Sequence, residues 1–347
     1  MSLRKHVRIL LLALALPMWL SFFASAFAAP TPKPYAQRDD VRQFIDEMAE
    51  KHGFVKKELR MLFAKARFQP NIIKAITPPT EPRAKSWQAY RALFLTPQRI
   101  EAGAAFREQH REVLARAVEL YGVPEEIIIA IIGVETVYGR NTGGYRVIDA
   151  LTTLAFDYRP RAAFFRGELE HFLLYARDAG IDTLALKGSY AGAIGIPQFM
   201  PGSYRRYAVD HDGDGRQDLS GSFADAIGSV ANFLKAHGWE AGQPVAFPVE
   251  VQGDNYRKLV DAGIKPTYRC GDFAGFGAVV GVSVGAGAGA DADAPCALID
   301  LPTPGEATRY LAGLNNFYVL TRYNRSNLYA AAVMELAQAV KSVYSNK

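Results

Sequence analysis

Apolar residues recur along most of the chain at the three- and four-residue spacing of amphipathic helices. This spacing predicts helices over residues 39–67, 87–122, 124–139, 161–179, 223–237 and 327–343. Three prolines within residues 77–83 remove backbone donors and exclude a helix between the first two segments. We therefore expect a largely helical protein.

The pattern changes near residue 245, where short β-prone pieces replace the helical spacing. These pieces cover residues 245–251, 278–284, 297–301 and 317–322, and glycine and proline separate them. The simplest architecture is a helical body with a small β-rich module inserted before the last helix. The predicted fold class is α+β, mainly α.

The N-terminus has the pattern of a secretory signal. Arg4, Lys5 and Arg8 precede an almost continuous apolar run over residues 9–27, and the run closes on Ala-Phe-Ala, a small-x-small cleavage pattern. This pattern predicts removal of residues 1–28 and a periplasmic location. The alternative is an uncleaved membrane anchor, because the run is nearly long enough to span a bilayer. No cysteine lies at the end of this run, so we expect no lipid attachment there.

The charge of the chain argues against a nucleic-acid partner. The whole sequence has a formal net charge of +5, and residues 1–28 hold three of the positive charges, so the remainder carries +2. Nucleic-acid-binding domains normally show a clustered basic face, and no long run of lysine and arginine occurs here. An anionic cell wall is an acceptable partner for such a mildly basic protein.

Cys270 and Cys296 are the only cysteines, and in an oxidising compartment they are most simply a disulfide. The bridge would close a 27-residue loop that includes the flexible segment 285–295, which stabilises the fold by about 3 kcal/mol in the chain-entropy picture. A metal site would need more ligands, and redox pairs are usually spaced more closely. We expect a structural role.

Glu135 is the single acidic residue within the apolar stretch of residues 127–139. Its neighbours three and four positions away are apolar or glycine rather than lysine or arginine. Burial among hydrocarbon penalises the carboxylate and raises its pKa, which suits a general acid near neutral pH. Gly133 and Gly139 would leave space for a ligand. The alternative is a buried glutamate paired with an arginine or a backbone donor from elsewhere.

The glycine-rich segment 188–204 is the second candidate for site chemistry. Gly192 and Gly195 permit close backbone approach, and Gln198 places a primary amide among apolar neighbours. Such an amide can bind an acetamido group or a sugar hydroxyl, with Phe199 as a stacking face. The alternative is a loop that serves packing alone.

An acidic loop follows this segment. Carboxylates occupy positions 1, 3, 5 and 9 of a calcium-loop pattern, namely Asp210, Asp212, Asp214 and Asp218. Gly215 at position 6 allows the sharp turn, and Arg216 at position 7 would contribute its backbone carbonyl. Position 12 is Gly221 instead of glutamate, so Asp225 is the natural substitute. We expect structural Ca²⁺ and no cofactor for catalysis; the alternative is a solvated acidic turn.

Five motifs occur in order along the chain: Gly-Val-Glu-Thr-Val-Tyr-Gly at 133–139, Phe-Asp-Tyr at 156–158, the run Ala-Gly-Ala-Ile-Gly-Ile-Pro-Gln-Phe-Met-Pro at 191–201, the segment 225–239, and Tyr-Asn-Arg-Ser-Asn-Leu-Tyr at 323–329. Together they closely resemble the lytic murein transglycosylase B family. The resemblance covers nearly the whole chain after residue 28 and includes an enlarged EF-hand-like loop.

The resemblance implies a lysozyme-like helical core at residues 86–244, with its calcium-binding loop at 210–225. We expect an N-terminal helical segment at 29–85, the β-rich module at 245–320 and a C-terminal helix at 321–347 that returns to the core.

The resemblance also implies the chemistry. Glu135 would protonate the glycosidic oxygen between N-acetylmuramic acid and N-acetylglucosamine in peptidoglycan. As a carboxylate it would then take the proton from the muramoyl 6-hydroxyl, which attacks its own anomeric carbon. The product is a 1,6-anhydro sugar, no water is consumed, and the second carboxylate of ordinary glycosidases is not required.

The same resemblance assigns substrate contacts. Ser189 and Gln198 would line subsites beside Glu135, and the cleft would include Tyr90, Tyr204, Tyr323 and Asn324. Phe233 stands where the family has a tyrosine, so stacking would survive and a hydroxyl hydrogen bond would be lost. Arg159 and Arg161 would meet substrate carboxylates; surface ion pairs are an equal alternative.

Two rival functions stay open at this point. A muramidase would admit water and hydrolyse the same bond. A calcium-dependent wall-binding protein would keep the groove without activity, although a pure binder does not need a carboxylate in an apolar site. Beyond glycan strands, we expect partners among proteins of cell-wall synthesis or remodelling.

Overall fold

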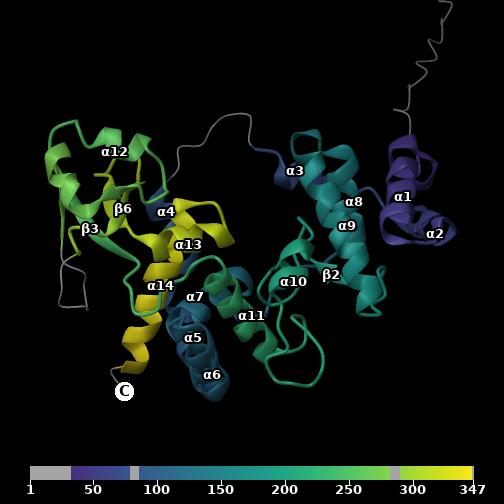
Figure 1. The fold of residues 1–347 in the computed structure, drawn as a ribbon, viewed down its shortest axis with the longest axis horizontal. Coiled ribbons are helices and arrows are strands. Elements are labelled where there is room, and N and C mark those ends of the chain that lie inside the picture. The colour runs from purple at the N-terminus through teal and green to yellow at the C-terminus, as the bar shows by residue number, and fades with distance from the viewer. Residues whose placement is uncertain (1–32, 79–85, 282–289, 346–347) are drawn as a thin grey trace, which may run out of the picture.

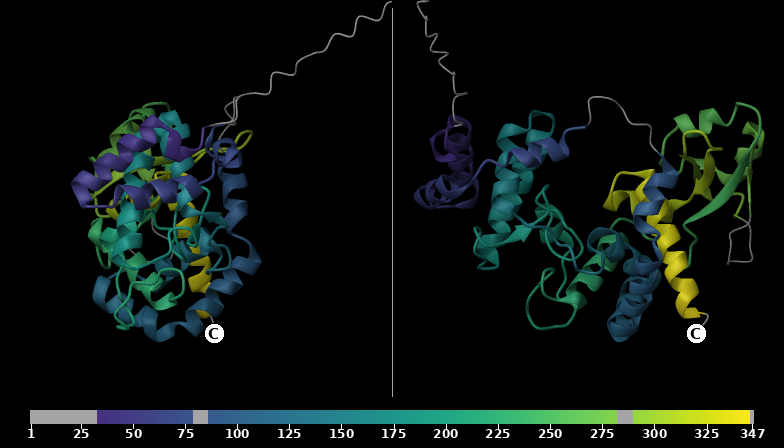
Figure 2. Two further views of the ribbon diagram at one scale, coloured as in Figure 1. Left: turned by 90° about the vertical axis from the view of Figure 1, so that its right-hand side faces the viewer. Right: turned by 180° about the vertical axis from the view of Figure 1, so that it is seen from behind.

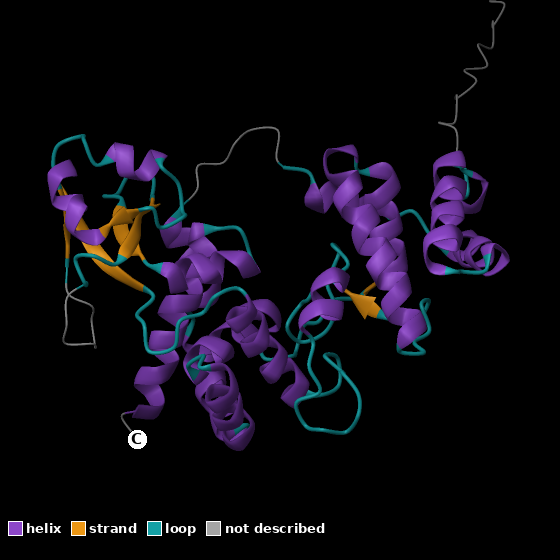
Figure 3. Ribbon diagram, in the orientation of Figure 1, coloured by secondary structure: helices purple, strands orange, loops and turns teal. Residues whose placement is uncertain are grey.

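The computed structural model describes residues 33–78, 86–281 and 290–345. The predicted signal at residues 1–28 lies outside this part of the chain. Helices form most of the described structure, and the larger sheet lies at one end of its longest dimension (Figures 1 and 3). The prediction of a mainly helical α+β fold is confirmed.

The chain opens with a short 3-10 helix, η1 (Tyr35–Gln37), and three helices: α1 (Asp39–His52), α2 (Lys56–Lys65) and α3 (Pro70–Ile76). Two aspartates in the first turn of α1 complement its positive N-terminus, and Gly53 ends it with a left-handed φ of 69°. The buried side of α1 carries Val41, Phe44, Ile45 and Met48, as the spacing predicts.

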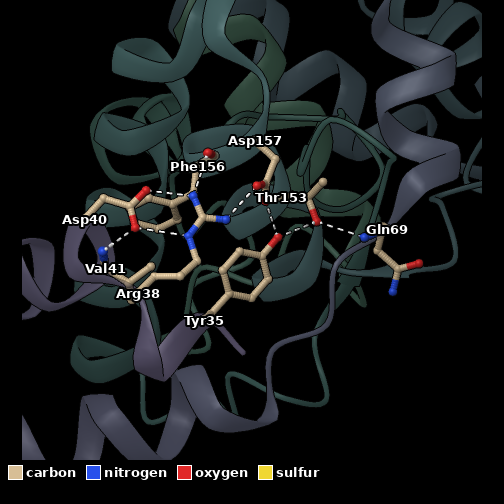
Figure 4. A network of polar contacts seen from close by, with 8 residues as sticks. All are labelled: Tyr35, Arg38, Asp40, Val41, Gln69, Thr153, Phe156 and Asp157. Atoms are coloured by element: carbon tan, nitrogen blue, oxygen red, sulfur yellow. Dashed lines mark hydrogen bonds and ion pairs between the residues drawn. The ribbon is translucent and has the colours of Figure 1, made fainter. Parts of the chain in front are cut away.

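A polar network fastens these N-terminal helices to the body (Figure 4). Asp157, at the end of α8 (Val147–Asp157), accepts hydrogen bonds of 2.6 Å from the Tyr35 hydroxyl and from Arg38. The Arg38 guanidinium also holds the pKa of the Asp40 carboxyl below its usual value. The ring of Phe44 packs edge-on against Phe156 beside this network.

The helical body holds α4 (Trp87–Phe94), α5 (Pro97–Gln109), α6 (Arg111–Tyr121), α7 (Glu125–Thr136), α9 (Ala162–Asp178), α10 (Pro201–Tyr207), α11 (Phe223–Ala236), α13 (Asn315–Tyr323) and α14 (Asn327–Ser345). A 3-10 turn, η2 (Arg159–Arg161), joins α8 to α9. Helix α7 lies in the middle of the body and packs against α5, α11 and α14 (Figures 1 and 2). Nine of its twelve residues are buried, so this segment shows little amphipathic pattern.

A five-stranded antiparallel sheet in the order β4-β6-β7-β3-β5 forms the smaller module. Its strands are β3 (Ala246–Val251), β4 (Tyr268–Arg269), β5 (Ala278–Val280), β6 (Pro295–Leu301) and β7 (Arg309–Gly313), with α12 (Arg257–Asp261) and η3 (Cys270–Phe276) between them. The predicted disulfide joins Cys270 to Cys296, whose Cα atoms lie 5.3 Å apart. Both cysteines belong to a separate small core within the module.

The strand predicted at residues 317–322 is wrong, because this segment lies within the helix α13. Phe317, Val319 and Leu320 are β-prone by type, but all three are buried and α13 packs against α14 and α11. Tertiary packing therefore overrides the local preference. Strand β7, the helices α8 and α10 and a two-stranded sheet of β1 (Tyr145–Arg146) and β2 (Lys187–Gly188) were not predicted.

Candidate active site

The C-terminal end of α7 has an unusual backbone. Val137 and Tyr138 both have left-handed φ angles, of 53° and 59°, which cost side-chain-bearing residues about 1–3 kcal/mol each. The Thr136 hydroxyl donates to the carbonyl of Ile196 at 2.9 Å and accepts from the amide of Gly139 at 2.9 Å. These bonds tie the end of α7, directly beyond Glu135, to the glycine-rich segment.

The two glycines near Glu135 do not leave room for a ligand, contrary to the prediction. A Cβ atom on Gly133 would lie 2.7 Å from the Tyr138 hydroxyl oxygen, and one on Gly139 would lie 2.9 Å from the ring of Phe223. Protein side chains fill both spaces. The glycines therefore serve close packing behind the carboxylate.

Glu135 lies near the C-terminal end of α7 and is only partly accessible to solvent. Burial raises the pKa of its carboxyl from the ordinary value of 4.5 to about 7, and a hydrogen bond from Tyr329 lowers it in part. No described positive side chain contributes to this pKa, so the alternative of a buried Glu-Arg pair does not hold. A carboxyl of this kind can be protonated or ionised near neutral pH.

Three tyrosines surround this carboxyl. The Tyr329 hydroxyl donates to Oε1 of Glu135 at 2.7 Å, and the Tyr323 ring stacks on Tyr329 with centroids 6.3 Å apart. Burial and the negative charge of Glu135 raise the pKa values of Tyr90 and Tyr323. These hydroxyls are therefore neutral donors, and two of the three were predicted as cleft residues.

The glycine-rich segment is fixed by close backbone contacts. A Cβ on Gly143 would lie 2.1 Å from the carbonyl oxygen of Gly188, so only glycine fits there. The Ser189 hydroxyl oxygen accepts from the amides of Ala191 and Ala193 at 3.3 and 3.0 Å. The Ser189 hydroxyl proton therefore remains available for a hydrogen bond to a ligand.

Gln198 is held in a strained conformation with φ 54°. Its amide nitrogen donates to the carbonyls of Thr142 at 3.1 Å and Gly195 at 2.8 Å. The two donors of the amide are thus occupied, and its carbonyl oxygen has no hydrogen-bond partner in the described part of the chain. That oxygen is an oriented acceptor.

Tyr204 and Phe233 are both buried, and Tyr204 borders a cavity beside the acidic loop that does not include Glu135. Tyr204 is 1% exposed, and its hydroxyl bonds to Gln217 and Leu219 of the acidic loop. Phe233 is 5% exposed and stacks on His237 with centroids 4.0 Å apart. Phe233 also packs on Tyr323 at 4.9 Å, so it supports a site tyrosine from behind.

Asn324, Arg159 and Arg161 are exposed. Asn324 ends α13 directly after Tyr323. The Arg161 guanidinium lies over the rings of Phe164 and Phe165 at 4.4 and 5.0 Å. Neither arginine forms an ion pair with another described residue, so the surface-ion-pair alternative does not hold for them within these ranges.

The acidic loop brings three of its carboxylates together. Oxygen atoms of Asp210, Asp212 and Asp214 lie within 4.8 Å of one another, which suits the oxygen ligands that Ca²⁺ prefers. Gly215 has a φ of 87° at the predicted sharp turn. The donor set and the turn therefore fit a hard cation, with the Arg216 carbonyl next in the loop.

Asp218 and Asp225 lie outside this three-carboxylate group, contrary to the predicted ligand set. Asp225 is buried and accepts from the amides of His211 and Asp218, each at 2.7 Å. Asp218 accepts from the amides of Ser220 and Gly221. These two carboxylates hold the loop backbone, as Asp210 also does by accepting from the amides of Gly213, Asp214 and Gly215.

A cavity of about 1040 Å³ lies beside the acidic loop and does not include Glu135. Tyr175, Ile181, Leu186 and Arg205 are among its lining residues. Large clefts are the usual first candidates for ligand sites. The raised carboxyl of Glu135 and its tyrosines do not line this cavity, and they form the candidate active site.

Tyr329 is the site residue that the sequence did not single out. It lies 194 residues from Glu135 in the chain, and spacing alone does not predict such a contact. The motif at 323–329 contains it, and that motif was the available signal.

The chain is similar to known proteins over almost its whole described length. The model of the family described as "Transglycosylase SLT domain" matches residues 36–338. The membrane-bound lytic murein transglycosylase B of Escherichia coli (strain K12) is 42% identical over 315 residues, which cover 88% of this chain and 84% of that protein.

Two solved structures are similar as well. The soluble lytic transglycosylase SltB1 from Pseudomonas aeruginosa superposes with a TM-score of 0.81 at 45% identity, over 88% of this chain and 99% of that one. The Escherichia coli lytic transglycosylase Slt35 in complex with calcium gives a TM-score of 0.75 at 41% identity, over 90% and 94%.

Proposed function

The chain belongs to the transglycosylase SLT domain family and is a lytic transglycosylase of peptidoglycan, and from this premise we propose that Glu135 alone performs both proton transfers. The bond cut is the β-1,4 bond between N-acetylmuramic acid and N-acetylglucosamine. The muramoyl residue leaves with a 1,6-anhydro end.

In the first step, protonated Glu135 donates to the glycosidic oxygen as the bond from that oxygen to the muramoyl C1 breaks. Tyr329 bonds to Oε1, so Oε2 is the oxygen that carries the transferable proton. A pKa of about 7 keeps a large share of the carboxyl protonated near neutral pH.

In the second step, the Glu135 carboxylate takes the proton from the muramoyl 6-hydroxyl, whose oxygen forms the new bond to C1. The hydrogen bond from Tyr329 stabilises the carboxylate between the two transfers. The enzyme returns to its protonated form, and no water enters the balance.

The observation that carries this proposal is the isolation of the raised carboxyl. No other described carboxylate contributes to the pKa of Glu135, whereas ordinary glycosidases pair two carboxyl groups across the scissile bond. A lone acid fits a reaction in which the substrate supplies its own nucleophile.

Substrate contacts follow from the free polar atoms of the site. The Gln198 carbonyl oxygen would accept from an acetamido N–H or a sugar hydroxyl, and the Ser189 hydroxyl would donate to a sugar oxygen. Tyr90 and Tyr323 would line the sugar sites beside Glu135, with exposed Asn324 next to them. Arg159 and Arg161 would meet substrate carboxylates.

We further propose that Asp210, Asp212, Asp214 and the Arg216 carbonyl hold Ca²⁺. A calcium ion would offset the repulsion of three adjacent carboxylates and stiffen the loop that follows Gln198 in the chain. Its role is structural, because Glu135 lies on another segment. The calcium complex of Slt35 supports this proposal.

The relationship to a membrane-bound transglycosylase fits a location in the cell envelope, and we propose the periplasm. None of the helices in the described part of the chain reaches the length and hydropathy that a bilayer crossing requires.

The test is Glu135→Gln in the chain without residues 1–28. We expect loss of muropeptide release from purified sacculi, with an unchanged circular dichroism spectrum and retained sacculus binding. The control is Glu125→Gln at the other end of α7, whose carboxylate pairs with Arg107 at 3.0 Å. Substantial release by Glu135→Gln with no loss in the control contradicts the assignment.

Mass spectrometry of the released fragments separates the two cleavage chemistries. Fragments lighter by one water than reducing-end muropeptides support the anhydro product, and reducing ends support hydrolysis. Binding without release by the unmodified chain would favour the wall-binding alternative.

A further inference from the structure

Positive charge is concentrated in one stretch of the chain that no step of the reaction uses. Residues 51–74 contain seven basic side chains and one acidic one, a net charge of +6. The chain after residue 28 has a net charge of only +2, so the rest of it is net negative. All seven are exposed: Lys51, Lys56, Lys57, Arg60, Lys65, Arg67 and Lys74. Lys51 lies on α1 and Lys74 on α3, whereas Lys56, Lys57, Arg60, Lys65 and Arg67 lie on α2 or just after it, and we call these five the basic face.

Most of the basic face is not neutralised locally. Lys56 pairs with Asp46 at 2.6 Å, and it is the only one of the seven side chains with an ion pair to a described residue. Glu58 is the only acid within the segment. Like Lys56, Arg60 lowers the pKa of the Asp46 carboxyl, so Lys57, Lys65 and Arg67 carry the excess positive charge of the face.

Large apolar side chains project among these charges. Val55, Met61 and Phe68 are 54%, 51% and 39% exposed. Leu59 and Phe63 fix the orientation of α2, because their side chains are buried. Lys57, Met61 and Lys65 follow at four-residue spacing on the opposite side of the helix.

The position of the face leaves the active site free. Helices α1 and α2 lie at one end of the longest dimension, and the sheet module lies at the other (Figures 1 and 2). The unit is fixed to the body by Arg38 on Asp157 and by Arg177, whose guanidinium donates to the carbonyl of His52 at 2.7 Å. A flat surface that binds α2 would therefore immobilise the whole enzyme.

We propose that the basic face docks on the surface of an anionic phospholipid bilayer. Lysine and arginine clusters bind lipid phosphates, and exposed apolar side chains between them enter the interfacial layer. A polysaccharide would satisfy the charges, but it offers no apolar layer for Val55 and Met61. The same objection applies to nucleic acid.

The experiment measures co-sedimentation of residues 29–347, which include every described residue, with large vesicles. Vesicles of phosphatidylcholine mixed with phosphatidylglycerol should bind the protein, and pure phosphatidylcholine vesicles should not. Raising the salt from about 0.05 M to about 0.5 M should weaken binding, because screening acts on exposed charges. Equal binding to both vesicle types overturns the proposal.

Matched variants locate the surface. Lys57→Gln with Lys65→Gln should lower the partition coefficient roughly tenfold or more, and Met61→Ser should lower it roughly fivefold. The controls are Lys258→Gln with Lys265→Gln, which removes the same charge from the sheet module, and Leu120→Ser at a side chain 47% exposed. Equal losses in variants and controls overturn the proposal.

A failure of the membrane proposal can be distinguished from a failure of the proposed reaction. Muropeptide release from suspended sacculi should be unchanged in the Lys57, Lys65 and Met61 variants, because the helix that carries these residues, α2, lies well apart from α7, which carries Glu135 (Figure 1). Loss of sacculus binding with full vesicle binding in the lysine variant would assign the face to the wall and refute the membrane proposal.

Discussion

The hydroxyl of Tyr329 donates a 2.7 Å hydrogen bond to Oε1 of Glu135, which joins the start of α14 to the end of α7. Burial raises the pKa of this carboxyl and the contact with Tyr329 lowers it, and the net pKa is about 7. The two effects together leave the acid able to donate and then to accept a proton within one turnover.

Tyr329→Phe should raise the pKa of Glu135, because the hydrogen bond that the substitution removes stabilises the carboxylate. A hydrogen bond to a charged group is worth about 1.5 kcal/mol, so the alkaline limb of the activity profile should move up by roughly one pH unit. Activity near neutral pH should fall, since the carboxylate is less stabilised after the first transfer.

The measurement is the rate of muropeptide release between pH 5 and 9. Tyr310→Phe serves as the control, because the Tyr310 hydroxyl bonds to Tyr256 within the sheet module. An alkaline limb that stays in place in Tyr329→Phe would show that this contact does not tune the acid.

The pKa of Glu135 also predicts a dependence of stability on pH. The folded protein holds a proton on this carboxyl up to about pH 7, whereas the ordinary value is 4.5. Unfolding therefore releases this proton between these pH values, and the protein loses stability as the pH rises through them. The contribution is up to about 3 kcal/mol.

Glu135→Gln should remove this dependence. The variant should gain stability over the parent chain at pH 8 and show little gain at pH 4, as measured by urea unfolding. An equal difference at both pH values would mean that the carboxyl is not perturbed by burial.

The raised pKa of Glu135 could be predicted from the sequence because its signal is local: one acid in an isoleucine-rich helix. The sequence missed Tyr329 because that contact depends on how α14 packs on α7. It missed helix α8 for a related reason: residues 147–155 are all buried, and the polar side chains Asp149 and Thr153 contact the N-terminal segment instead of solvent. The wrong strand at 317–322 shows tertiary packing overriding local preference.

The residues predicted to line the cleft also differ in how far their local sequence indicates their contacts. Gln198 carries a free carbonyl oxygen, as the predicted acetamido contact requires, because backbone carbonyls occupy its donors. Tyr204 was assigned to the cleft by motif alone, and its hydroxyl instead holds the acidic loop. Sequence position does not reveal which side of a loop an aromatic ring covers.

Calcium binding should stabilise the protein through the acidic loop. We expect a chelator to lower the thermal midpoint, and Asp214→Ala to remove the difference between chelated and calcium-loaded protein. Asp225→Ala should cost about 1–3 kcal/mol in both conditions, because two backbone amides lose their acceptor. A calcium-dependent midpoint in Asp214→Ala would exclude the proposed ligand set.

Glu335 should be the carboxylate whose loss most weakens the attachment of α4. It is 8% exposed and pairs with Arg91 of α4 at 2.5 Å and with Arg309 of β7. Glu335→Gln should cost about 1–2 kcal/mol, because a buried acceptor for two cations is lost while both arginines can still reach water. Glu108→Gln in the exposed pair with Arg111 should cost less than about 0.5 kcal/mol. Urea unfolding measures both, and equal costs would show that the Glu335 cluster contributes no more than a surface pair.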